Sequence, residues 1–523
     1  MLFGFLMFQL YRFRYDFDTI FYITVAKLVS QGRFLESITG YWSPLISWIM
    51  SLAFIFKLPV LLLFKVFQFI AGAFFILGFY ILLSRVRLSE TIKLLTLLTA
   101  TIITVLFSAW HTTADMLMYS ILIYYLVLIT SSAYSQSRYR GLGCGIISGL
   151  AFLAKHYVIF FFPLHFGFTH WLLYCYFQGE LAKRKNIVRA FALGVIAFAI
   201  IAGSWIGVLS WHYKKFTIYK TPTFLFFYSP ISTYIAKNKT TEVFASKSFL
   251  FELTNGKENG YLNSPDFYSR AIDNYLAEGH ITQKDILIII GANLLKNVYN
   301  FFCSLLLSSV FSVAILVLGI TYIVFLSRKY PPRFILLIII SAIVIYYFGL
   351  IVIFPEGRYL FFANILLLLL GSFLLERLLR GSLFTAAGRK FLLICYFCSF
   401  IAVPLKNAIW LRYTDKEIHS IARQLKGYGI KGRLCSQMIL SSYIISLNLE
   451  SEFYPIGSNN ILNEELDTTQ LEGALKRYGI DYYLLWEGKE ARYPFLEKYR
   501  EVLGGKIKGI KVYSLKEPLL VGH

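Results

Sequence analysis

The stretch Arg14–Trp48, RYDFDTIFYITVAKLVSQGRFLESITGYWSPLISW, decides how the rest of the chain is interpreted. Two carboxylates, Asp16 and Asp18, follow the first apolar run, and a helical periodicity begins directly after them. The apolar stripe of that predicted helix comprises Phe17, Ile20, Phe21, Val25 and Leu28. Asp18 and Tyr22 fall one turn apart on another face. The pattern predicts a helix that lies on a membrane surface and carries acids at the water boundary.

A carboxylate at such a boundary can meet both a lipid phosphate and a water-soluble acceptor. The pair Asp16 and Asp18 is equally consistent with simple capping of the helix N-terminus, where negative charge is favoured. The sequence leaves these two interpretations open.

Composition indicates a polytopic membrane protein. Of the 523 residues, 57% are hydrophobic and only 15% are charged, and the mean hydropathy is +0.62. The formal charge of +22 does not indicate nucleic-acid binding, because the basic residues are spread through short loops between apolar runs. The six cysteines form neither a disulfide framework nor a zinc-site pattern.

We predict an all-α membrane domain over 1–411, with about eleven transmembrane helices when the N-terminal apolar run is included. Two outer segments interrupt it, a first outer loop at 12–58 and a long segment at 212–283 that holds a helix at 266–276. The stretch 43–57 is expected to be interfacial or re-entrant. The remaining apolar runs predict spans at 59–83, 94–110, 116–132, 141–154, 157–178, 187–210, 301–327, 334–353, 359–379 and 390–411.

The short loops predict the orientation in the cell membrane. Lys and Arg gather in every second loop, at 85–93, 138–140, 183–189, 328–333 and 377–390, and this side is assigned to the cytoplasm. The charged groups near the other helix ends, together with 212–283 and everything after about 412, then lie on the non-cytoplasmic side. Charges at membrane boundaries are costly and are therefore candidates for function.

From residue 412 to 523 the composition predicts a small soluble α/β domain. Ile418, Ile421, Ala422 and Leu425 give one helical stripe, and the stretch 466–479 gives a second helix with Asp467 as its cap. RLCSQM, IDYYLLWE and IKVYSL predict short strands. Acceptor binding and structural support both remain open as roles for this domain.

Four further patches fall on the predicted outer side, and each has a structural alternative. Asp115 heads a span after Trp110 and His111 and could act as a helix cap. Lys155 and His156 end a short helix, where a cation is favoured by the helix dipole as well as by a phosphate. In Pro355–Tyr359, Glu356 and Arg358 stand at a turn, and an Arg suits bidentate phosphate binding. Tyr41 and Trp42 could stack on a sugar or belong to an interfacial aromatic belt.

The order of these motifs resembles the GT-C superfamily of polyprenyl-phosphate-sugar glycosyltransferases. The matching motifs are D-x-x-x-Y, W-x-P-L-x-x-W, an Asp that heads a later span, G-L-A-F-L-x-K and E-x-R-Y-L, and they extend over about residues 12–380. The nearest likenesses are bacterial aminoarabinose transferases and protein O-mannosyltransferases. Asp18 matches the acidic residue of the first outer loop, although Thr19 follows it where relatives often have Glu. Asp115 matches the second acidic position, and Arg358 matches the Arg that opens a late span.

The resemblance implies direct displacement with inversion at the sugar. Asp18 would act as general base with Asp16 in support and Asp115 as a third catalytic acid, while Arg358, Lys155 and His156 bind the donor phosphate. Tyr22, Tyr41, Trp42 and Glu356 would contact substrates. The partners are a polyprenyl-phosphate sugar and a lipid, glycan or protein acceptor, and no nucleic acid. No cofactor is certain, and a divalent cation on Asp18 or Asp16 stays open.

A transporter or flippase of lipid-linked sugars or small anions is the alternative function, since boundary charges also suit a substrate path. The sequence shows no inverted repeat or paired Gly/Pro-broken spans, and its charges lie at one face. Both features favour the transferase.

Overall fold

The computed structural model describes residues 2–219, 283–322, 333–353, 357–381, 384–411, 416–455, 468–488 and 493–518. By their contacts these residues fall into two compact units. The first draws on Met1–Arg12, Ile38–Phe226 and Gln283–Arg412, and the second on Phe13–Ser37 and Tyr413–His523. The stretch Phe13–Ser37, which we assigned to the membrane domain, therefore groups with the C-terminal residues.

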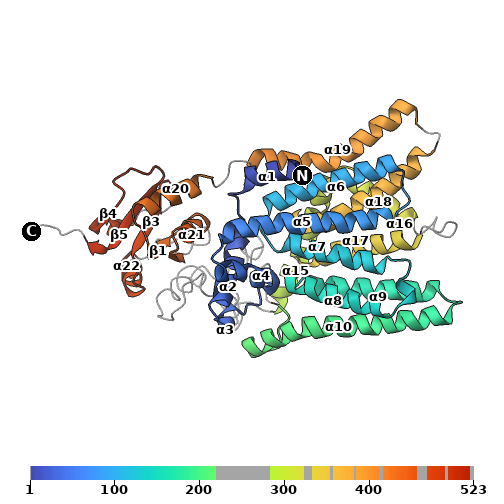
Figure 1. Cartoon of the computed structure of the whole chain (residues 1–523), viewed down its shortest axis with the longest axis horizontal. Coiled ribbons are helices and arrows are strands. Elements are labelled where there is room, and N and C mark those ends of the chain that lie inside the picture. Colours follow the sequence, from blue (N-terminus) through green and yellow to red (C-terminus); the bar gives the residue numbers. More distant parts are fainter. Residues whose placement is uncertain are drawn as a thin grey trace, which may run out of the picture. The chain divides into compact units, whose positions relative to one another are not determined.

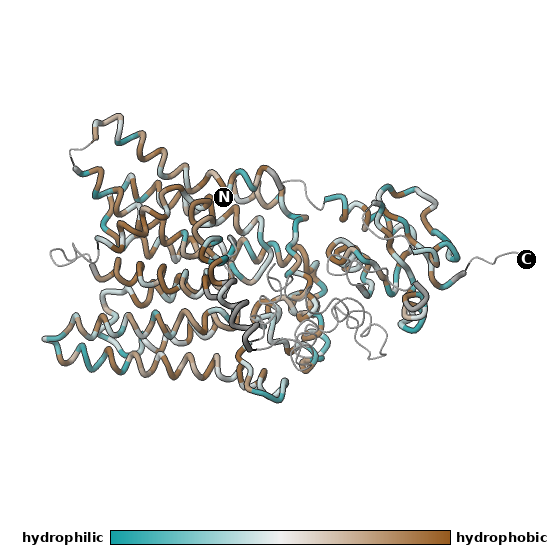
Figure 2. The backbone as a smooth tube through the Cα atoms, turned by 180° about the vertical axis from the view of Figure 1, so that it is seen from behind, coloured by the Kyte–Doolittle hydropathy of each residue, from teal (hydrophilic) through white to brown (hydrophobic). Residues whose placement is uncertain are grey.

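The first unit is helical throughout its described part, and its long helices run side by side in Figure 1. Apolar residues colour these helices over most of their length (Figure 2). The helices are α1 (Leu2–Tyr11), α4 (Pro44–Ile55), α5 (Val60–Ser84), α6 (Glu90–Trp110), α7 (Asp115–Ile129), η1 (Tyr134–Gln136), α8 (Tyr139–Ala154), α9 (Val158–Tyr176), α10 (Leu181–Tyr213), α15 (Gln283–Ser308), α16 (Ser312–Thr321), α17 (Arg333–Ile353), η4 (Gly357–Leu360), α18 (Phe361–Leu379) and α19 (Ala386–Leu411).

Within the described residues, 7 helices are long and apolar enough to cross a membrane, or 8 if a bent pair counts as one span. The predicted spans at 116–132 and 141–154 are the shorter apolar helices α7 and α8. The chain is thus a multi-pass membrane protein. Its apolar stretch at 43–57 forms the 12-residue helix α4, which is shorter than the roughly 20 residues that a span needs.

The predicted span at 301–327 is not one straight helix in its described part. Helix α15 begins earlier, at Gln283, and the chain bends by 102° between Leu294–Ser308 and Ser312–Thr321. At the break, the buried Ser309 accepts a hydrogen bond from the Phe311 backbone N–H at 3.2 Å and contacts the Ser399 hydroxyl at 2.6 Å. A serine side chain that takes up a backbone donor makes such an interruption of the helical ladder possible. The predicted helix at 266–276 lies outside the described residues.

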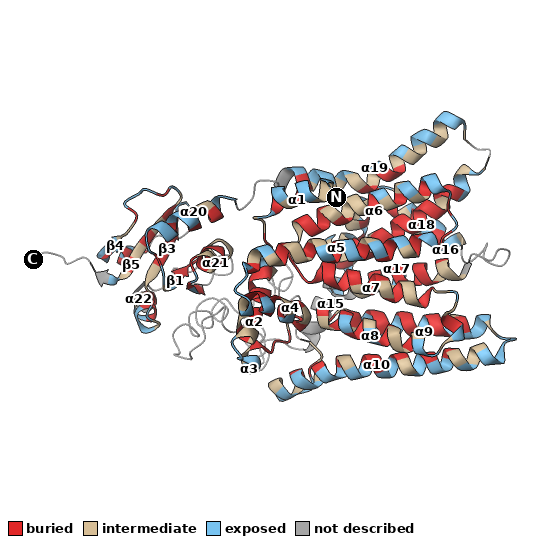
Figure 3. Cartoon of the chain, in the orientation of Figure 1, coloured by how far each residue is buried: buried red, intermediate tan, exposed pale blue. Residues whose placement is uncertain are grey.

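The middle of the bundle is formed by α7 and α18, whose residues are mostly buried, whereas α10 exposes much of its surface (Figure 3). Helices α8 and α10 approach each other through glycines. A Cβ added at Gly141 would lie 1.9 Å from the Ala190 carbonyl oxygen, and one at Gly145 would lie 2.1 Å from the Gly194 carbonyl oxygen. Only glycine permits this backbone contact, and small residues commonly allow membrane helices to pack closely.

The second unit contains α2 (Phe17–Ser30) and α3 (Phe34–Ser37) together with a five-stranded sheet of order β2-β1-β3-β5-β4. Strands β1 and β2 and strands β1 and β3 pair in parallel, and β5 pairs antiparallel with β3 and β4. This confirms the predicted small α/β domain. Its elements are α20 (Lys416–Gly427), β1 (Arg433–Ser436), α21 (Ile439–Asn448), β2 (Glu452–Pro455), α22 (Thr468–Arg477), β3 (Tyr482–Trp486), η5 (Pro494–Lys498), β4 (Tyr499–Glu501) and β5 (Ile510–Pro518).

Helix α2 is not the one-sided amphipathic helix that the sequence predicted. Every residue of 19–26 is buried, and Tyr22, which we placed on the polar face with Asp18, is only 3% exposed. Part of this burial comes from the C-terminal domain. The Thr24 hydroxyl lies 3.0 Å from the Tyr443 hydroxyl of α21, and the rings of Phe13 and Tyr15 pack against His419 of α20.

Candidate active site

Several predicted site residues of the first unit meet at one end of its helix bundle. Asp115 begins α7, Lys155 lies between α8 and α9, and Arg358 lies in η4 between α17 and α18. The α6–α7, α8–α9 and α17–α18 connections all lie at this end of the bundle. Asp115, Lys155 and Arg358 are close enough for both cations to act electrostatically on the carboxylate. Asp115, Lys155 and Arg358 thus form one cluster.

The Asp115 carboxylate has a partner on each oxygen. The Lys155 ammonium forms an ion pair with Oδ1, and the Thr113 hydroxyl donates to Oδ2 at 2.6 Å. Asp115 is completely buried, whereas the Lys155 side chain keeps 21% of its surface exposed. A carboxylate with both oxygens engaged and no access to solvent is poorly placed to accept a proton from a substrate. Its geometry suits holding the lysine in position.

Arg358 is attached to the same cluster through aromatic neighbours. The Tyr119 hydroxyl of α7 donates to the Arg358 carbonyl oxygen at 2.9 Å, and the Arg358 guanidinium donates to the Tyr359 hydroxyl at 3.1 Å. The Lys155 ammonium stands 4.2 Å from the centre of the Tyr359 ring, a cation–π distance. The partly exposed cations of Lys155 and Arg358 therefore both contact Tyr359, and the buried Asp115 carboxylate lies beside them.

Two polar residues of α5 that we did not single out support the loop before Asp115. The completely buried Lys65 donates to the Ala109 carbonyl oxygen at 2.8 Å, and the Gln68 amide donates to the Thr113 carbonyl oxygen at 2.8 Å. Ala109 lies in the last turn of α6 and Thr113 follows the helix, so neither carbonyl has a donor within the helix. The signal was present in the sequence, because a lysine inside an apolar helix is costly and marks a specific partner.

His156 is neutral near pH 7. Burial, and secondarily the charge of Lys155, lowers the pKa of His156 to about 3. Trp205 donates to its Nε2 at 3.3 Å, so Nε2 is the acceptor and Nδ1 carries the hydrogen. In the part of the chain that the structure describes, this buried Nδ1–H has no hydrogen-bond acceptor. His156 can therefore offer a substrate a hydrogen bond but no positive charge.

The remaining predicted residues are placed as follows. The rings of Tyr41 and Trp42 pack edge to face at 4.5 Å, and the next residue, Ser43, accepts a hydrogen bond from the His156 backbone N–H at 3.1 Å. Asp16 is the N-cap residue of α2 but makes no side-chain cap bond, and Asp18 lies in the first turn. Both belong to the second unit. Glu356 lies outside the described residues.

The described residues contain no group of three or more His, Cys, Asp or Glu side chains that could hold a metal ion. A site that used only Asp16 and Asp18 would fall below that number.

Comparison with solved structures identifies the architecture. The chain matches the Archaeoglobus fulgidus oligosaccharyltransferase, crystallised with zinc and sulfate, at a TM-score of 0.51 and 12% identity, over 92% of this chain and 67% of that one. The chain has the GT-C fold. The chain also matches ArnT from Cupriavidus metallidurans, in the apo state and bound to undecaprenyl phosphate, at TM-scores of 0.45 and 0.43 and identities of 12% and 13%.

These two ArnT matches cover 98% and 100% of this chain and 96% and 98% of ArnT. No family model matches this chain, and no curated protein matches it.

Proposed function

We propose that this protein is an integral-membrane glycosyltransferase that moves a sugar from a polyprenyl-phosphate donor to a lipid, glycan or protein acceptor on the non-cytoplasmic face of the cell membrane. The observation that carries the proposal is that the Lys155 and Arg358 cations both contact the Tyr359 ring, next to the buried Asp115 carboxylate. The polyprenyl phosphate leaves with negative charge, and two fixed cations at a helix-bundle end stabilise that charge. The GT-C fold of the chain agrees with this chemistry.

The proposed reaction is a direct displacement. Asp18 takes the proton from the acceptor hydroxyl or amine, whose lone pair forms a bond to the anomeric carbon. The bond between that carbon and the donor phosphate oxygen breaks at the same time, and its electron pair leaves with the polyprenyl phosphate. The configuration at the sugar is inverted. Arg358 and Lys155 hold the phosphate, and the Nδ1–H of His156 donates a hydrogen bond to it.

The other residues have supporting roles in this proposal. Asp115 keeps the Lys155 ammonium at the phosphate, which makes it a positioning residue in place of the third catalytic acid that the resemblance implied. Asp16 supports Asp18, and Tyr41 and Trp42 contact the sugar or acceptor. Glu356 stays a substrate contact by resemblance alone.

The test is direct transfer by the purified full-length protein. It is incubated with a radiolabelled pool of polyprenyl-phosphate sugars, and the label is followed into extracted lipid, glycan and protein. Asp18→Asn should lower the transfer rate by roughly 10² to 10⁴, because the amide keeps the shape of the carboxylate but cannot accept the proton.

Glu36→Gln is the matched control, since it also removes one carboxylate from the stretch before Ser37, in an exposed pair with Arg33. It should leave the rate unchanged. Near-normal transfer in well-folded Asp18→Asn protein would move the base elsewhere, and no transfer by the wild type from any lipid-linked sugar would reject the function.

A further inference from the structure

A second polar site lies at the opposite end of the same bundle from Asp115. It is a cavity of about 330 Å³, walled by the C-terminal ends of α5, α7 and α9 and the start of α17. Helix α7 begins at Asp115 and ends at Ile129, so its 15 residues separate the two sites by about 20 Å. The cavity therefore does not belong to the candidate active site.

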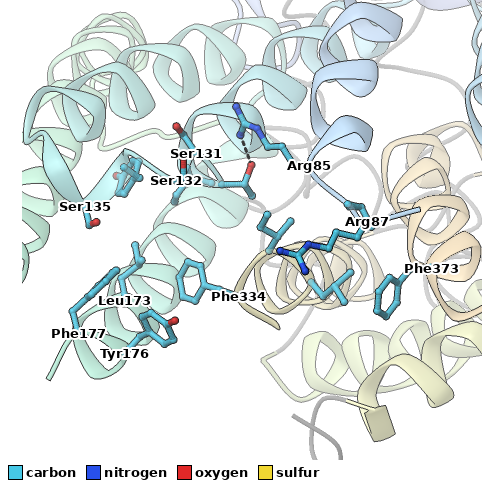
Figure 4. A pocket seen from close by; sticks show the side chains of 16 residues that line it. Arg85, Arg87, Ser131, Ser132, Ser135, Leu173, Tyr176, Phe177, Phe334 and Phe373 are labelled. Carbon is cyan, nitrogen blue, oxygen red and sulfur yellow. Dashed lines mark hydrogen bonds between the residues drawn. The ribbon is translucent and has the colours of Figure 1, made fainter. Parts of the chain in front are cut away.

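The polar lining of the cavity is made of cations and hydroxyl groups. Arg85 and Arg87 line it together with Thr130, Ser131, Ser132 and Ser135, and no lining residue is acidic (Figure 4). Arg85 donates from Nη1 to the Thr130 hydroxyl at 2.7 Å and to the Val127 carbonyl oxygen. This fixes the guanidinium in place at the end of α7. Within the described residues its other N–H groups have no protein acceptor.

More positive charge surrounds the cavity. Arg140 is near enough to Arg85 to repel it and donates to the hydroxyl of the lining residue Ser131. Two lining rings carry cations, with Lys183 at 4.7 Å from the centre of Phe177 and Arg377 at 5.2 Å from the centre of Phe373.

The nearby acids already have partners. Glu180 pairs with Lys183, and Glu376 pairs with Arg380 and accepts from Ser89.

The tendency of basic residues to flank cytoplasmic helix ends does not account for this arrangement. That tendency concerns the topology of the chain and is satisfied by side chains that extend into water, as the exposed Arg138 does. Arg85 is instead half-buried, held by two bonds and close to a second guanidinium. Like charges that are held together at a partly buried site are stabilised by an anion between them.

The remaining lining is apolar and aromatic. Leu173, Phe177, Phe334, Ile335 and Leu336 form it, and they belong to helices that are apolar enough to cross a membrane or adjoin them. A small-molecule pocket typically has a volume of about 300 to 1,000 Å³, so this one suits a headgroup better than a large solute. Basic pockets between membrane helices are a known mode of anionic headgroup binding.

We propose that this cavity binds a phosphate group, carried by the headgroup of an anionic membrane phospholipid. Arg87 and the free N–H groups of Arg85 contact the phosphate oxygens, and Ser132 and Ser135 add hydroxyl donors. The apolar wall accommodates the start of the lipid chains.

The experiment uses the full-length protein, purified in neutral detergent and washed free of lipid. Phosphatidylglycerol, phosphatidylcholine and inorganic phosphate are added separately, bound lipid is counted by native mass spectrometry, and thermal unfolding is recorded. Wild-type protein should bind phosphatidylglycerol at least about tenfold more tightly than phosphatidylcholine. Arg87→Gln should lose about tenfold of that affinity, the value of one charge-assisted contact.

Arg87 is the preferred variant because it is exposed and makes no hydrogen bond or ion pair among the described residues, so its removal should leave the fold intact. Arg138→Gln is the matched control: it removes the same charge at the same bundle end but does not line the cavity. It should bind as the wild type does. Equal affinity for the two lipids, or equal binding by Arg87→Gln and Arg138→Gln, would overturn the proposal.

The phosphate arm identifies the source of the ligand. Stabilisation by phosphatidylglycerol that exceeds that by inorganic phosphate supports a lipid. Stabilisation by inorganic phosphate alone, lost in Arg87→Gln, would keep the phosphate site but overturn the lipid as its occupant.

Discussion

The ammonium of Lys155 forms an ion pair with the carboxylate of Asp115, forty residues earlier in the chain, and the carboxylate is completely buried. The pair connects the loop between α8 and α9 to the first residue of α7. Removing one partner of a buried ion pair is strongly destabilising, because the remaining charge stays desolvated without its counterion. The stability of this end of the bundle should therefore depend on both residues together.

Lys155→Met should destabilise the protein by about 3 to 5 kcal/mol, because it leaves the Asp115 carboxylate buried without its cation. The double variant Asp115→Asn with Lys155→Met should recover much of that loss, since neither charge of the pair remains. Thermal unfolding in detergent measures both. Lys93→Met is the control, because its pair with the exposed Glu90 is worth at most about 1 kcal/mol. A double variant no more stable than Lys155→Met would show that the pair does not act as a unit.

Arg358→Lys should lower kcat/KM for transfer about 10- to 100-fold if the guanidinium binds the donor phosphate. An ammonium keeps the charge but cannot reproduce the planar fork of N–H donors. The measurement is the transfer assay at varied donor concentration. Arg380→Lys, at the far end of α18 in an ion pair with Glu376, makes the same change away from the site and should have no effect. Equal rates for the two variants would remove Arg358 from phosphate binding.

Tyr443→Phe should loosen α2, the helix that carries Asp18. The change removes the hydroxyl that lies 3.0 Å from Thr24, and a buried hydrogen bond contributes about 1 kcal/mol. Hydrogen–deuterium exchange of peptides from 17–30 should become faster, and the transfer rate should fall with it. Tyr428→Phe, an exposed tyrosine of the same domain, is the control. Unchanged exchange in Tyr443→Phe would mean that other contacts fix the helix.

Acidification should weaken the C-terminal domain through His419. Burial, and secondarily the charge of Arg423, lowers the pKa of His419 to about 4, below its usual value near 6.5. The neutral imidazole is thus favoured by folding, so its contribution is fully present above pH 6.5 and is lost as the pH falls toward 4. The loss reaches about 3 kcal/mol. The protection of β1 and β3 peptides from exchange, taken relative to the intrinsic exchange rate at each pH, should fall between pH 7 and pH 5 less in His419→Leu than in the wild type, and parallel profiles would contradict this.

The orientation predicted from Lys and Arg can be tested by fusion. A reporter that is active only in the cytoplasm should stay silent when fused after Lys516, because the C-terminal domain is expected on the other side. The same reporter after Arg138, in a truncated chain, should be active. Activity at Lys516 would reverse the orientation and place the Asp115 cluster in the cytoplasm.

The helices and the candidate cations could be predicted because their signals are local. A run of apolar residues specifies a span, and Asp115, Lys155 and Arg358 each stood at the predicted end of one. The break at Ser309 could not be predicted, because it depends on a hydroxyl of α19 that is distant in sequence. The burial of Tyr22 was missed for a similar reason, since the partner of α2 comes from residues 416–448. Strands β2 and β4, which have 4 and 3 residues, were not predicted.

The glycine contact between α8 and α10 has a consequence for how the protein is made. Its partners, Gly141 with Ala190 and Gly145 with Gly194, all lie before Tyr213. Both α8 and α10 are therefore synthesised before α15 and every helix after it. Because lipid supplies no hydrophobic force between helices, such close packing is what holds an early intermediate together. The three helices α8, α9 and α10 can thus pack together in the bilayer before the later helices insert beside them.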